Sequence, residues 1–597
     1  MEREQATAAY NFVPLGPMVV PAPLAGETEE DGRKWSELEA KEQQKRFAAY
    51  VRAWGKNSGW FDVTVEALTP FLVGGAEDNG VFFAPDGRPR LPGSSLRGMT
   101  RNLVKILGCG AMRSDEDFAD KRLYFRVIAA KSGDTRNEHY KQLIHADATG
   151  KSGAKPGFLM RLQDGKYVIC RAQEEKQKPL HFGDQPDIHW NGHTAVAIGG
   201  PMKGKRAVYE ITAEDWTDPY EVPDRLIQDY LADPRRIQKD WQKKEKAIDL
   251  LDETRNYSGD ICELTGRTDV RFVVPCHYIL GVDGKVESFG HGSKYRLPYE
   301  QAISDHVPAP LTATAESCPD LGDAIFGAAA LWAGRVSFED GILQGEPAFE
   351  TASLTRPQLA PKPTAYQMYL KQPAQDGMAK HHWDSDKKKS PLRGYKFYWH
   401  QHTAWQHQDG KEKDPVISGA TPVQPLKPGA RFVARIHFQD LSDIELGALC
   451  AALGLGKQGN VAYKLGRGKA LGMGSVRVKP TPHLMNEKGQ YQSFFSDGRL
   501  AHVEKEAAWD DYIQAFKTYR AEQLGTRAAA FDETEKSLLA VMDYSLAGDK
   551  GTSKASAWAA QVATMPIGNK QDKRFAHHIV LPDIRTVVAQ AKQGRKK

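Results

Sequence analysis

The stretch Arg88–Leu107, RPRLPGSSLRGMTRNLVKIL, places a loop directly before a helix. Pro92 and Gly93 interrupt the preceding segment, and Ser94 or Ser95 can cap the helix that follows. Apolar residues then recur at helical spacing, at Leu96, Met99, Leu103, Ile106 and Leu107. We therefore predict an amphipathic helix that begins at this loop and packs its apolar stripe against a core.

The same helix carries basic side chains on another face. Arg97, Arg101 and Lys105 recur at intervals of four residues. Beside the backbone N–H groups and the positive dipole end of a helix N-terminus, such cations suit a phosphate backbone. An ordinary amphipathic helix with a solvated basic face is the alternative interpretation.

Two strand patterns accompany this helix in the chain. In FDVTVEALT (61–69) and in RFVARIHF (431–438), apolar and polar residues alternate with the period of a half-buried strand. Ser442 precedes Glu445 by three residues, a capping box that predicts a helix directly after the second strand. The predicted buried stripe of this helix is Leu446, Leu449, Cys450 and Leu453. Strands and helices of both kinds indicate an α+β core.

A glycine-rich basic loop follows, KLGRGKALGMGSVRV (464–478). Its glycines allow close backbone approach, and Lys464, Arg467 and Lys469 supply positive charge. The segment is not a dinucleotide fingerprint, because Leu471 stands at the third glycine position and a strand follows. The loop fits contact with a polyanion, and a complex β-turn is the alternative.

The stretch SPLRGYKFYWHQH (390–402) interleaves aromatic residues with the cations Arg393 and Lys396. Surfaces of this kind stack the bases of single-stranded nucleic acid, although a buried aromatic strand has the same pattern. His400 and His402, with His407, could hold a metal ion, but no further ligands stand at suitable spacing. We therefore predict no metal site from side chains of this stretch.

The composition narrows the class of protein. At 597 residues the chain exceeds what one hydrophobic core usually serves, and 40% hydrophobic with 26% charged residues is typical of soluble globular proteins. The 81 basic and 76 acidic residues give a formal charge of only +5, so a polyanion would have to meet local basic patches. Six cysteines without a CxxC pair argue against a disulfide framework and a standard structural zinc site.

Targeting signals are absent from the sequence pattern. The N-terminus lacks the charged-then-apolar pattern of a signal peptide, and no apolar run approaches the length of a membrane span. We therefore expect a cytoplasmic protein with reduced thiols and no membrane partner.

GKS at 150–152 is not a phosphate-binding P-loop, because His145 stands where that motif needs a glycine.

Several motifs, taken in order, carry a family resemblance. LPGSSLRGMTR (91–101), IFGAAALWAGRVSFEDGIL (325–343) and KLGRGKALGMGSV (464–476) resemble the RAMP (repeat-associated mysterious protein) superfamily of CRISPR-associated proteins. The chain most resembles the crRNA-binding backbone subunits of type III effector complexes. Further segments are similar to a large-subunit RAMP family of about this length: AYNFVPLG (9–16), FGHGSKYRLPYE (289–300), PKPTAYQMYL (361–370) and LRGYKFYWH (392–400). The resemblance extends to about Lys479.

The resemblance implies an RRM or ferredoxin-like RAMP core that binds crRNA and complementary target RNA beside other CRISPR effector subunits. In that fold the helix after Pro92 holds the crRNA backbone and the glycine-rich loop lines the same groove. The predicted RNA-binding residues are Gly93, Ser94, Ser95, Arg97, Arg101, Lys105, Arg393, Lys396, Lys464, Arg467 and Lys469.

The resemblance also implies a candidate catalytic residue. In target-cleaving backbone subunits an aspartate in the loop before the PGSS helix supports metal-dependent scission, and Asp78 stands at the matching place. The cofactor would then be Mg²⁺ or another divalent cation. Glu77 and Asp86 are substitutes, and a hairpin tip formed by Asp78, Asn79 and Gly80 is the alternative without catalysis.

The chain is about twice as long as typical backbone subunits, so we divide it into five parts. Residues 1–55 form an N-terminal segment, and residues 56–130 and 311–480 form the two halves of the RAMP core. Residues 131–310 are an insertion or a degenerate second RAMP domain. Residues 481–597 form a helical C-terminal extension, which docks a neighbouring subunit or caps the fold.

Three functions compete at this stage. The first is a crRNA-binding effector subunit in antiviral defence, with or without cleavage of the guide-paired target. The second is a stand-alone endoribonuclease that processes precursor crRNA, with His291, His400 or His402 as general acid or base. The third is a non-catalytic structural scaffold.

Overall fold

The structure is a computed structural model. It describes residues 5–26, 33–53, 55–74, 80–113, 122–127, 135–149, 151–177, 188–198, 208–233, 249–253, 256–329, 331–358, 365–373, 381–407, 420–457, 459–486, 495–496, 499–500, 504–506, 508–565 and 579–594. None of the helices in these ranges has both the length and the apolar composition needed to cross a membrane.

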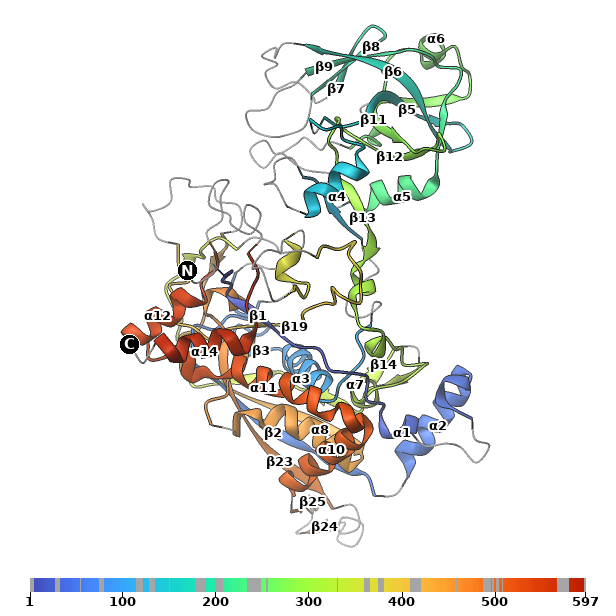
Figure 1. Ribbon diagram of the computed structural model, residues 1–597. Coiled ribbons are helices and arrows are strands. Elements are labelled where there is room, and N and C mark those ends of the chain that lie inside the picture. Colours follow the sequence, from blue (N-terminus) through green and yellow to red (C-terminus); the bar gives the residue numbers. More distant parts are fainter. Residues whose placement is uncertain are drawn as a thin grey trace.

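One antiparallel sheet forms the centre of the larger lobe (Figure 1). Its strand order is β22 (Tyr463–Lys464), β23 (Ser475–Met485), β2 (Asn57–Ala67), β21 (Arg431–Leu441), β17 (Gly341–Gln344) and β3 (Arg90–Leu91). Two short strands lie off this path, β16 (Val336–Phe338) paired with β21 and β26 (Glu504–Lys505) paired with β23. Along the chain the main elements run β2, α3 (Gly93–Leu107), β16 and β17, β21, α8 (Asp443–Gly454) and β23, which is a β-α-β-β-α-β order.

Strand β2 lies at the middle of this sheet, and its burial alternates in step with the apolar and polar residues of its sequence. Val63 pairs with Ala434 of β21 on one side and with Pro480 of β23 on the other. Phe61, Val63 and Val65 are buried, whereas the residues between them are partly exposed. The predicted strands at 61–69 and 431–438 and the helix after Pro92 are therefore confirmed, and the protein is a mixed α+β fold.

Helix α8 is buried more completely than the sequence predicted. Its capping box is confirmed, since Ser442 Oγ accepts from the Glu445 N–H and the Glu445 carboxylate accepts from the Ser442 N–H at 2.8 Å. The predicted stripe of Leu446, Leu449, Cys450 and Leu453 is buried, and so is every other position from Glu445 to Gly454. Helix α10 (Trp509–Leu524) covers the outer side, with the Trp509 ring against Gly454. The start of the C-terminal extension thus packs on the core.

Segments from both ends of the chain meet at a two-stranded sheet. Strand β1 (Tyr10–Val13) pairs with β19 (Tyr395–Tyr398), so that Tyr10 lies opposite Tyr398. These strands come from AYNFVPLG and LRGYKFYWH, two of the motifs that carry the resemblance. Helices α11 (Ala528–Met542) and α14 (Ile584–Gly594) pack against β1.

A second lobe stands apart from the first in Figure 1. Its antiparallel sheet has the order β12 (Val286–Gly290), β11 (Val270–Leu280), β5 (Lys155–Leu162), β6 (Tyr167–Gln177), β9 (Val208–Ala213), β8 (Thr194–Ile198) and β7 (Ile188–Asn191), with β10 (Tyr220–Val222) on β6. Its helices are α4 (Thr135–Leu143), α5 (Asp224–Ala232) and α6 (Ile261–Thr265). The pair β4 (Arg122–Phe125) and β13 (Leu297–Ala302) leads from this lobe to the larger one.

The remaining described elements lie around the main sheet. The helices are α1 (Pro23–Gly26), α2 (Ala40–Arg52), α7 (Leu321–Phe326) and α12 (Ser553–Gln561). The strands are β14 (Gly327–Ala328), β15 (Trp332–Ala333), β18 (Ser353–Leu354), β20 (Pro422–Val423), β24 (Phe495–Ser496) and β25 (Arg499–Leu500). Strands β14 and β15 pair to form a short hairpin directly after α7.

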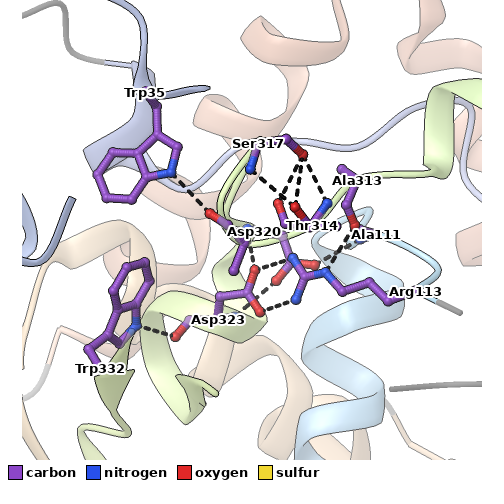
Figure 2. Close-up of polar contacts among 10 residues, drawn as sticks. Trp35, Ala111, Arg113, Ala313, Thr314, Ser317, Asp320, Asp323 and Trp332 are labelled. Atoms are coloured by element: carbon purple, nitrogen blue, oxygen red, sulfur yellow. Dashed lines mark hydrogen bonds and ion pairs between the residues drawn. The ribbon is translucent and has the colours of Figure 1, made fainter. Parts of the chain in front are cut away.

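A buried polar cluster anchors α7 and this hairpin (Figure 2). The Arg113 guanidinium donates to both carboxylate oxygens of Asp323, and both side chains are almost fully buried. Arg113 Nε also donates to the Ala313 carbonyl at 3.0 Å. The indole N–H of Trp332 donates to the Asp323 carbonyl at 2.9 Å, so the cluster also fixes the hairpin.

Candidate RNA-binding interface

Three of the predicted RNA-binding segments line one cavity of about 420 Å³. Helix α3 contributes Ser94, Ser95, Gly98 and Asn102, and β19 contributes the segment from Lys396 to Tyr398. The glycine-rich loop contributes Lys464, Gly466 and Lys469. We call this space the lysine cavity, after Lys396, Lys464 and Lys469. The three segments are far apart in the sequence, and the fold alone brings them together.

The lysine cavity concentrates positive charge in a buried place. Burial and the neighbouring Lys469 lower the pKa of Lys464 to about 7, and burial also lowers the pKa values of Lys396 and Lys469. No carboxylate of the described residues forms an ion pair with any of the three. A cavity of this charge favours an anionic ligand, which would restore the charged form of the amines.

Two of the lysines also make local contacts that hold them in place. Lys464 Nζ donates to the Met473 carbonyl at 2.9 Å and lies 3.4 Å from the Gly472 carbonyl. Lys396 Nζ lies 4.0 Å from the ring centroid of Tyr10, a cation–π contact across the β1–β19 pair. The ammonium groups are therefore oriented by the fold before any ligand binds.

The glycine-rich loop can follow its path only with glycine at the crowded positions. Gly466 has φ of 76°, and a Cβ atom there would stand 2.2 Å from the Leu72 carbonyl oxygen. Gly474 has φ of 73°, and its Cβ would stand 2.0 Å from the Leu465 carbonyl oxygen. The loop is thus a tight turn packed on the segment after β2, and its lysines face the cavity from this fixed turn.

The N-terminus of α3 differs from the prediction. Neither Ser94 nor Ser95 caps the helix, because Pro92 occupies the N-cap position. The Gly93 N–H donates to the Asp340 carboxylate at 2.8 Å, and a Cβ at Gly93 would stand 2.2 Å from the Phe338 carbonyl oxygen. The cap comes from a residue 247 positions away, so this N–H is already engaged.

The basic face of α3 points away from the lysine cavity. Arg97 Nη2 donates to the Phe326 carbonyl at 2.7 Å, and its guanidinium lies 5.6 Å from the Phe326 ring centroid. Arg97 and Arg101 line a separate, open depression of about 760 Å³ together with Trp332 of the β14–β15 hairpin. The predicted residues of α3 therefore lie on two faces of the helix: Ser94 and Ser95 line the lysine cavity, and Arg97 and Arg101 line the separate depression.

The other predicted cations lie outside both spaces. Arg393 is held by the Pro582 carbonyl, 3.2 Å from its Nη2, and burial lowers its pKa to about 10. The Arg467 backbone N–H donates to the Leu72 carbonyl at 2.8 Å, and its guanidinium packs against Gly74. Lys105 lines neither the cavity nor the depression.

The candidate catalytic position cannot be placed in the same way. Asp78 and Glu77 lie outside the described residues. Asp86 is described, and its carboxylate lies 2.5 Å from the Arg90 guanidinium on the surface, which lowers its pKa. On either side of the loop, Gly74 lies against Arg467 and Gly80 against Pro422.

The histidines of the 390–402 stretch have structural partners. Both ring nitrogens of His400 are engaged, Nδ1 with Ser475 Oγ at 2.9 Å and Nε2 with the Ala462 carbonyl at 3.1 Å. Burial holds the pKa of His400 well below its usual range. His402 Nε2 lies 3.3 Å from the Tyr544 hydroxyl. The imidazole rings of His400 and His402 are therefore held by side chains and backbone groups of neighbouring segments.

Some contributing residues escaped the sequence prediction. Gly98 and Asn102 follow Ser94 at intervals of four, and this row of residues without large apolar side chains was the available signal. Val541 and Met542 of α11 close the cavity, and no local pattern indicated them. Within the described ranges, His139, His382 and Asp384 also lie together, with His139 Nε2 hydrogen-bonded to Asp384 Oδ2 at 2.6 Å.

Residues 64–477 match the family model of the RAMP superfamily. The chain belongs to the RAMP superfamily. The matched span runs from β2 through α3 and α8 to β23, and it contains the lysine cavity apart from the α11 residues. No curated protein matches this RAMP chain.

Solved structures include chains that are similar to this RAMP protein. One similar chain is described as "CRISPR RNA-guided surveillance complex, pre-nicking", with 12% sequence identity. The match covers 89% of this chain and 99% of that chain at a TM-score of 0.19. A TM-score this low does not establish a common fold, so the family assignment rests on the sequence match.

Gly98 allows a test that separates folding from ligand binding in this RAMP protein. It is exposed inside α3, and no atom lies within 4 Å of the Cβ position. Gly98→Ala should raise the free energy of unfolding by about 0.8–1 kcal/mol, because glycine is a poor helix former. Gly98→Leu should keep the fold but weaken RNA binding by filling the cavity. Denaturant unfolding and RNA titration measure the two effects, and unchanged RNA affinity in Gly98→Leu would count against the cavity as a binding site.

Proposed function

We propose that this RAMP protein binds crRNA as a backbone subunit of a type III CRISPR effector complex in antiviral defence. The observation that carries the proposal is the lysine cavity, where α3, β19 and the glycine-rich loop meet without a paired carboxylate among the described residues. We take the β-α-β-β-α-β sheet beneath it to be the RRM or ferredoxin-like core of the family.

The proposed mode of binding follows from the groups in the cavity. Lys396, Lys464 and Lys469 would neutralise RNA phosphates, and Ser94 and Ser95 would donate hydroxyl hydrogen bonds to them. None of these groups reads a base edge specifically, so affinity would depend on salt and little on sequence. Specificity would come from base pairing between the guide and its target.

A second part of the proposal concerns target cleavage. Asp78 would support scission of the guide-paired RNA, and Asp86 is disfavoured as its substitute because Arg90 already pairs with it. Mg²⁺ or another divalent cation, when bound, would stabilise charge at the scissile phosphate and favour attack by the adjacent 2′-hydroxyl. The new bond between the 2′-oxygen and phosphorus would replace the P–O5′ bond, leaving a 2′,3′-cyclic phosphate on one product and a 5′-hydroxyl on the other, with the 2′-hydroxyl proton passing to the leaving oxygen through solvent.

Stand-alone processing of precursor crRNA is less well supported. Such an enzyme would need an accessible histidine as general acid or base, and His400 is buried with both ring nitrogens engaged. His402 is half-buried beside Tyr544, and burial lowers its pKa. The third candidate, His291, is partly exposed but does not line the lysine cavity. Because no candidate histidine is accessible at the lysine cavity, the crRNA-binding subunit remains the better proposal.

The proposal is tested by purifying the protein from its native locus and sequencing the RNA that remains bound. Guide-length RNA with repeat-derived ends would support it, and the absence of RNA would overturn it. Loss of RNA in a variant with Lys396, Lys464 and Lys469 replaced by glutamine would place the RNA in the lysine cavity.

Cleavage is tested separately with the assembled complex, complementary RNA and Mg²⁺. Asp78→Ala should lower the cleavage rate by about 10²–10³-fold, the range for removing one electrostatic group from an active site. Asp86→Ala is the matched control and should leave the rate unchanged. Guide RNA together with equal rates in both variants would keep the binding role and remove Asp78 from catalysis.

A further inference from the structure

We propose that a second cavity, in the smaller lobe, binds a nucleotide with its phosphate on Arg126 and Arg296 and its base beside Tyr230. The ligand would be a free nucleotide or one nucleotide of an RNA strand. This inference does not rest on the proposed function, because it uses none of the residues of the lysine cavity.

The second cavity has a volume of about 570 Å³ and lies between α5, β12 and the β4–β13 pair. Most of the FGHGSKYRLPYE motif (289–300) contributes to its wall, including Phe289, Tyr295 and Arg296. The size is in the range of small-molecule binding sites. The cavity thus gives this motif a location that the lysine cavity does not.

Two arginines, Arg126 and Arg296, lie side by side at one wall of this cavity, and only Arg296 has an ion pair among the described residues. Arg296 Nε donates to Asp233 Oδ2 at 2.7 Å, and its Nη2 donates to the Tyr124 carbonyl at 2.9 Å. Arg126 lies beside it, and no hydrogen bond or ion pair of Arg126 is found among the described residues. Burial and the repulsion from Arg296 lower the pKa of Arg126.

The other carboxylates of the wall are engaged elsewhere or exposed. Asp229 accepts from Arg122 at 3.0 Å and lies 3.7 Å from Arg225. Glu287 lies 3.2 Å from His145, and Glu300 is exposed. Of the two neighbouring guanidinium groups, Arg296 pairs with Asp233, and a phosphate would supply negative charge to both with bidentate geometry.

An aromatic and apolar wall adjoins the two arginines. The Tyr230 and Phe289 rings stack with centroids 5.2 Å apart. The Tyr230 hydroxyl accepts from the Leu250 N–H at 2.8 Å, which fixes the ring while leaving it partly exposed. Leu226 and Pro298 line the same space. Rigid aromatic rings next to arginines are what unstacked bases bind.

Two glycines of the motif, Gly290 and Gly292, allow the chain to fold into this wall of the cavity. A Cβ atom at Gly290 would stand 2.4 Å from the Tyr295 ring, so only glycine lets Tyr295 pack there. Gly292 has φ of 78°, which permits the turn between the two residues. Tyr295 is buried, and its carbonyl accepts from the Tyr140 hydroxyl at 2.7 Å. This packing places Arg296 next to Arg126.

The test measures binding of the four nucleoside 5′-monophosphates, inorganic phosphate and an unstructured oligoribonucleotide by calorimetry. The full-length protein carries Lys396→Gln, Lys464→Gln and Lys469→Gln, so that RNA in the lysine cavity does not contribute. Adding Arg126→Gln should weaken nucleotide binding by about tenfold or more, because a charged hydrogen-bonding group is lost. Arg171→Gln is the matched control in the same lobe, since it removes an exposed arginine paired with Asp218.

Each outcome decides the proposal. If the monophosphates bind and Arg126→Gln lowers their affinity, the ligand is a free nucleotide. If only the oligoribonucleotide binds and Arg126→Gln lowers its affinity, the ligand is one nucleotide within a strand. Inorganic phosphate binding as tightly as nucleotides overturns the assignment of a base site. No binding, or equal loss in Arg171→Gln, overturns the proposal.

Thermal unfolding separates ligand binding from a structural role of Arg126. A guanidinium buried beside another cation costs stability, so Arg126→Gln should leave the melting temperature of the ligand-free protein unchanged or raise it. A clear fall in melting temperature together with lost binding would mean that Arg126 supports the fold, and the proposal would fail.

Discussion

Arg113→Met is expected to lower the free energy of unfolding by about 3–5 kcal/mol, because it leaves the buried Asp323 carboxylate without its partner. Arg113 and Asp323 side chains expose only 4% and 1% of their surface, and the guanidinium contacts both carboxylate oxygens. Asp323 also accepts from the Asp320 N–H at 2.9 Å at the start of α7. Loss of Arg113 therefore disturbs the helix cap and the hairpin that Trp332 joins to it.

Denaturant unfolding of this variant is compared with Arg435→Met. Arg435 pairs with Asp62 at 2.8 Å on the open face of the sheet, where both side chains are well exposed. That control should cost no more than about 1 kcal/mol. The double variant Arg113→Met, Asp323→Asn should recover part of the lost stability, since the unpaired charge is removed. Equal costs at the two arginines would show that the buried pair contributes no more than a surface pair.

Replacing Lys396, Lys464 and Lys469 together by glutamine should lower the affinity for single-stranded RNA by at least about 10²-fold at low salt. Each lysine that neutralises a phosphate contributes about 0.7 to the slope of log affinity against log salt, so the slope should fall by about 2. The control replaces the exposed lysines Lys388, Lys427 and Lys536 by glutamine, with the same change in net charge.

Salt titrations of RNA binding distinguish the two triple variants. If both lose the same affinity and slope, binding depends on overall charge and the lysine cavity has no special role. If only the cavity variant changes, the phosphates contact Lys396, Lys464 and Lys469. Thermal unfolding without RNA checks that both variants remain folded.

The pH dependence of the same binding follows from Lys464. Its pKa of about 7 means that the amine is charged below this pH and becomes neutral above it. RNA affinity should therefore fall as the pH rises through about 7, and Lys464→Met should remove this part of the dependence. The ligand-free protein should change in the opposite direction, because the unfolded lysine keeps its proton up to about 10.5 and stability rises over that interval.

Short-range patterns in the sequence determined the main elements of the RAMP core. The alternation in 61–69 and 431–438 and the apolar spacing after Pro92 depend only on neighbouring residues, and the structure has β2, β21 and α3 there. The capping box at Ser442 is equally local. Close backbone approach at Gly466 and Gly474 could also be expected from the sequence, because glycine tolerates conformations and contacts that other residues do not.

Tertiary structure alone decided which of these elements share a site. The Asp340 cap on Gly93 and the β1–β19 pair join residues hundreds of positions apart, and the α10 cover on α8 joins two separate helices. No local pattern specifies these contacts. The same packing directs Arg97 to one face of α3 and Ser94 to another. The tertiary structure also decides the pKa of Lys464. The sequence gives the position of this lysine in the chain, but its pKa is lowered because segments that only the fold brings together bury it.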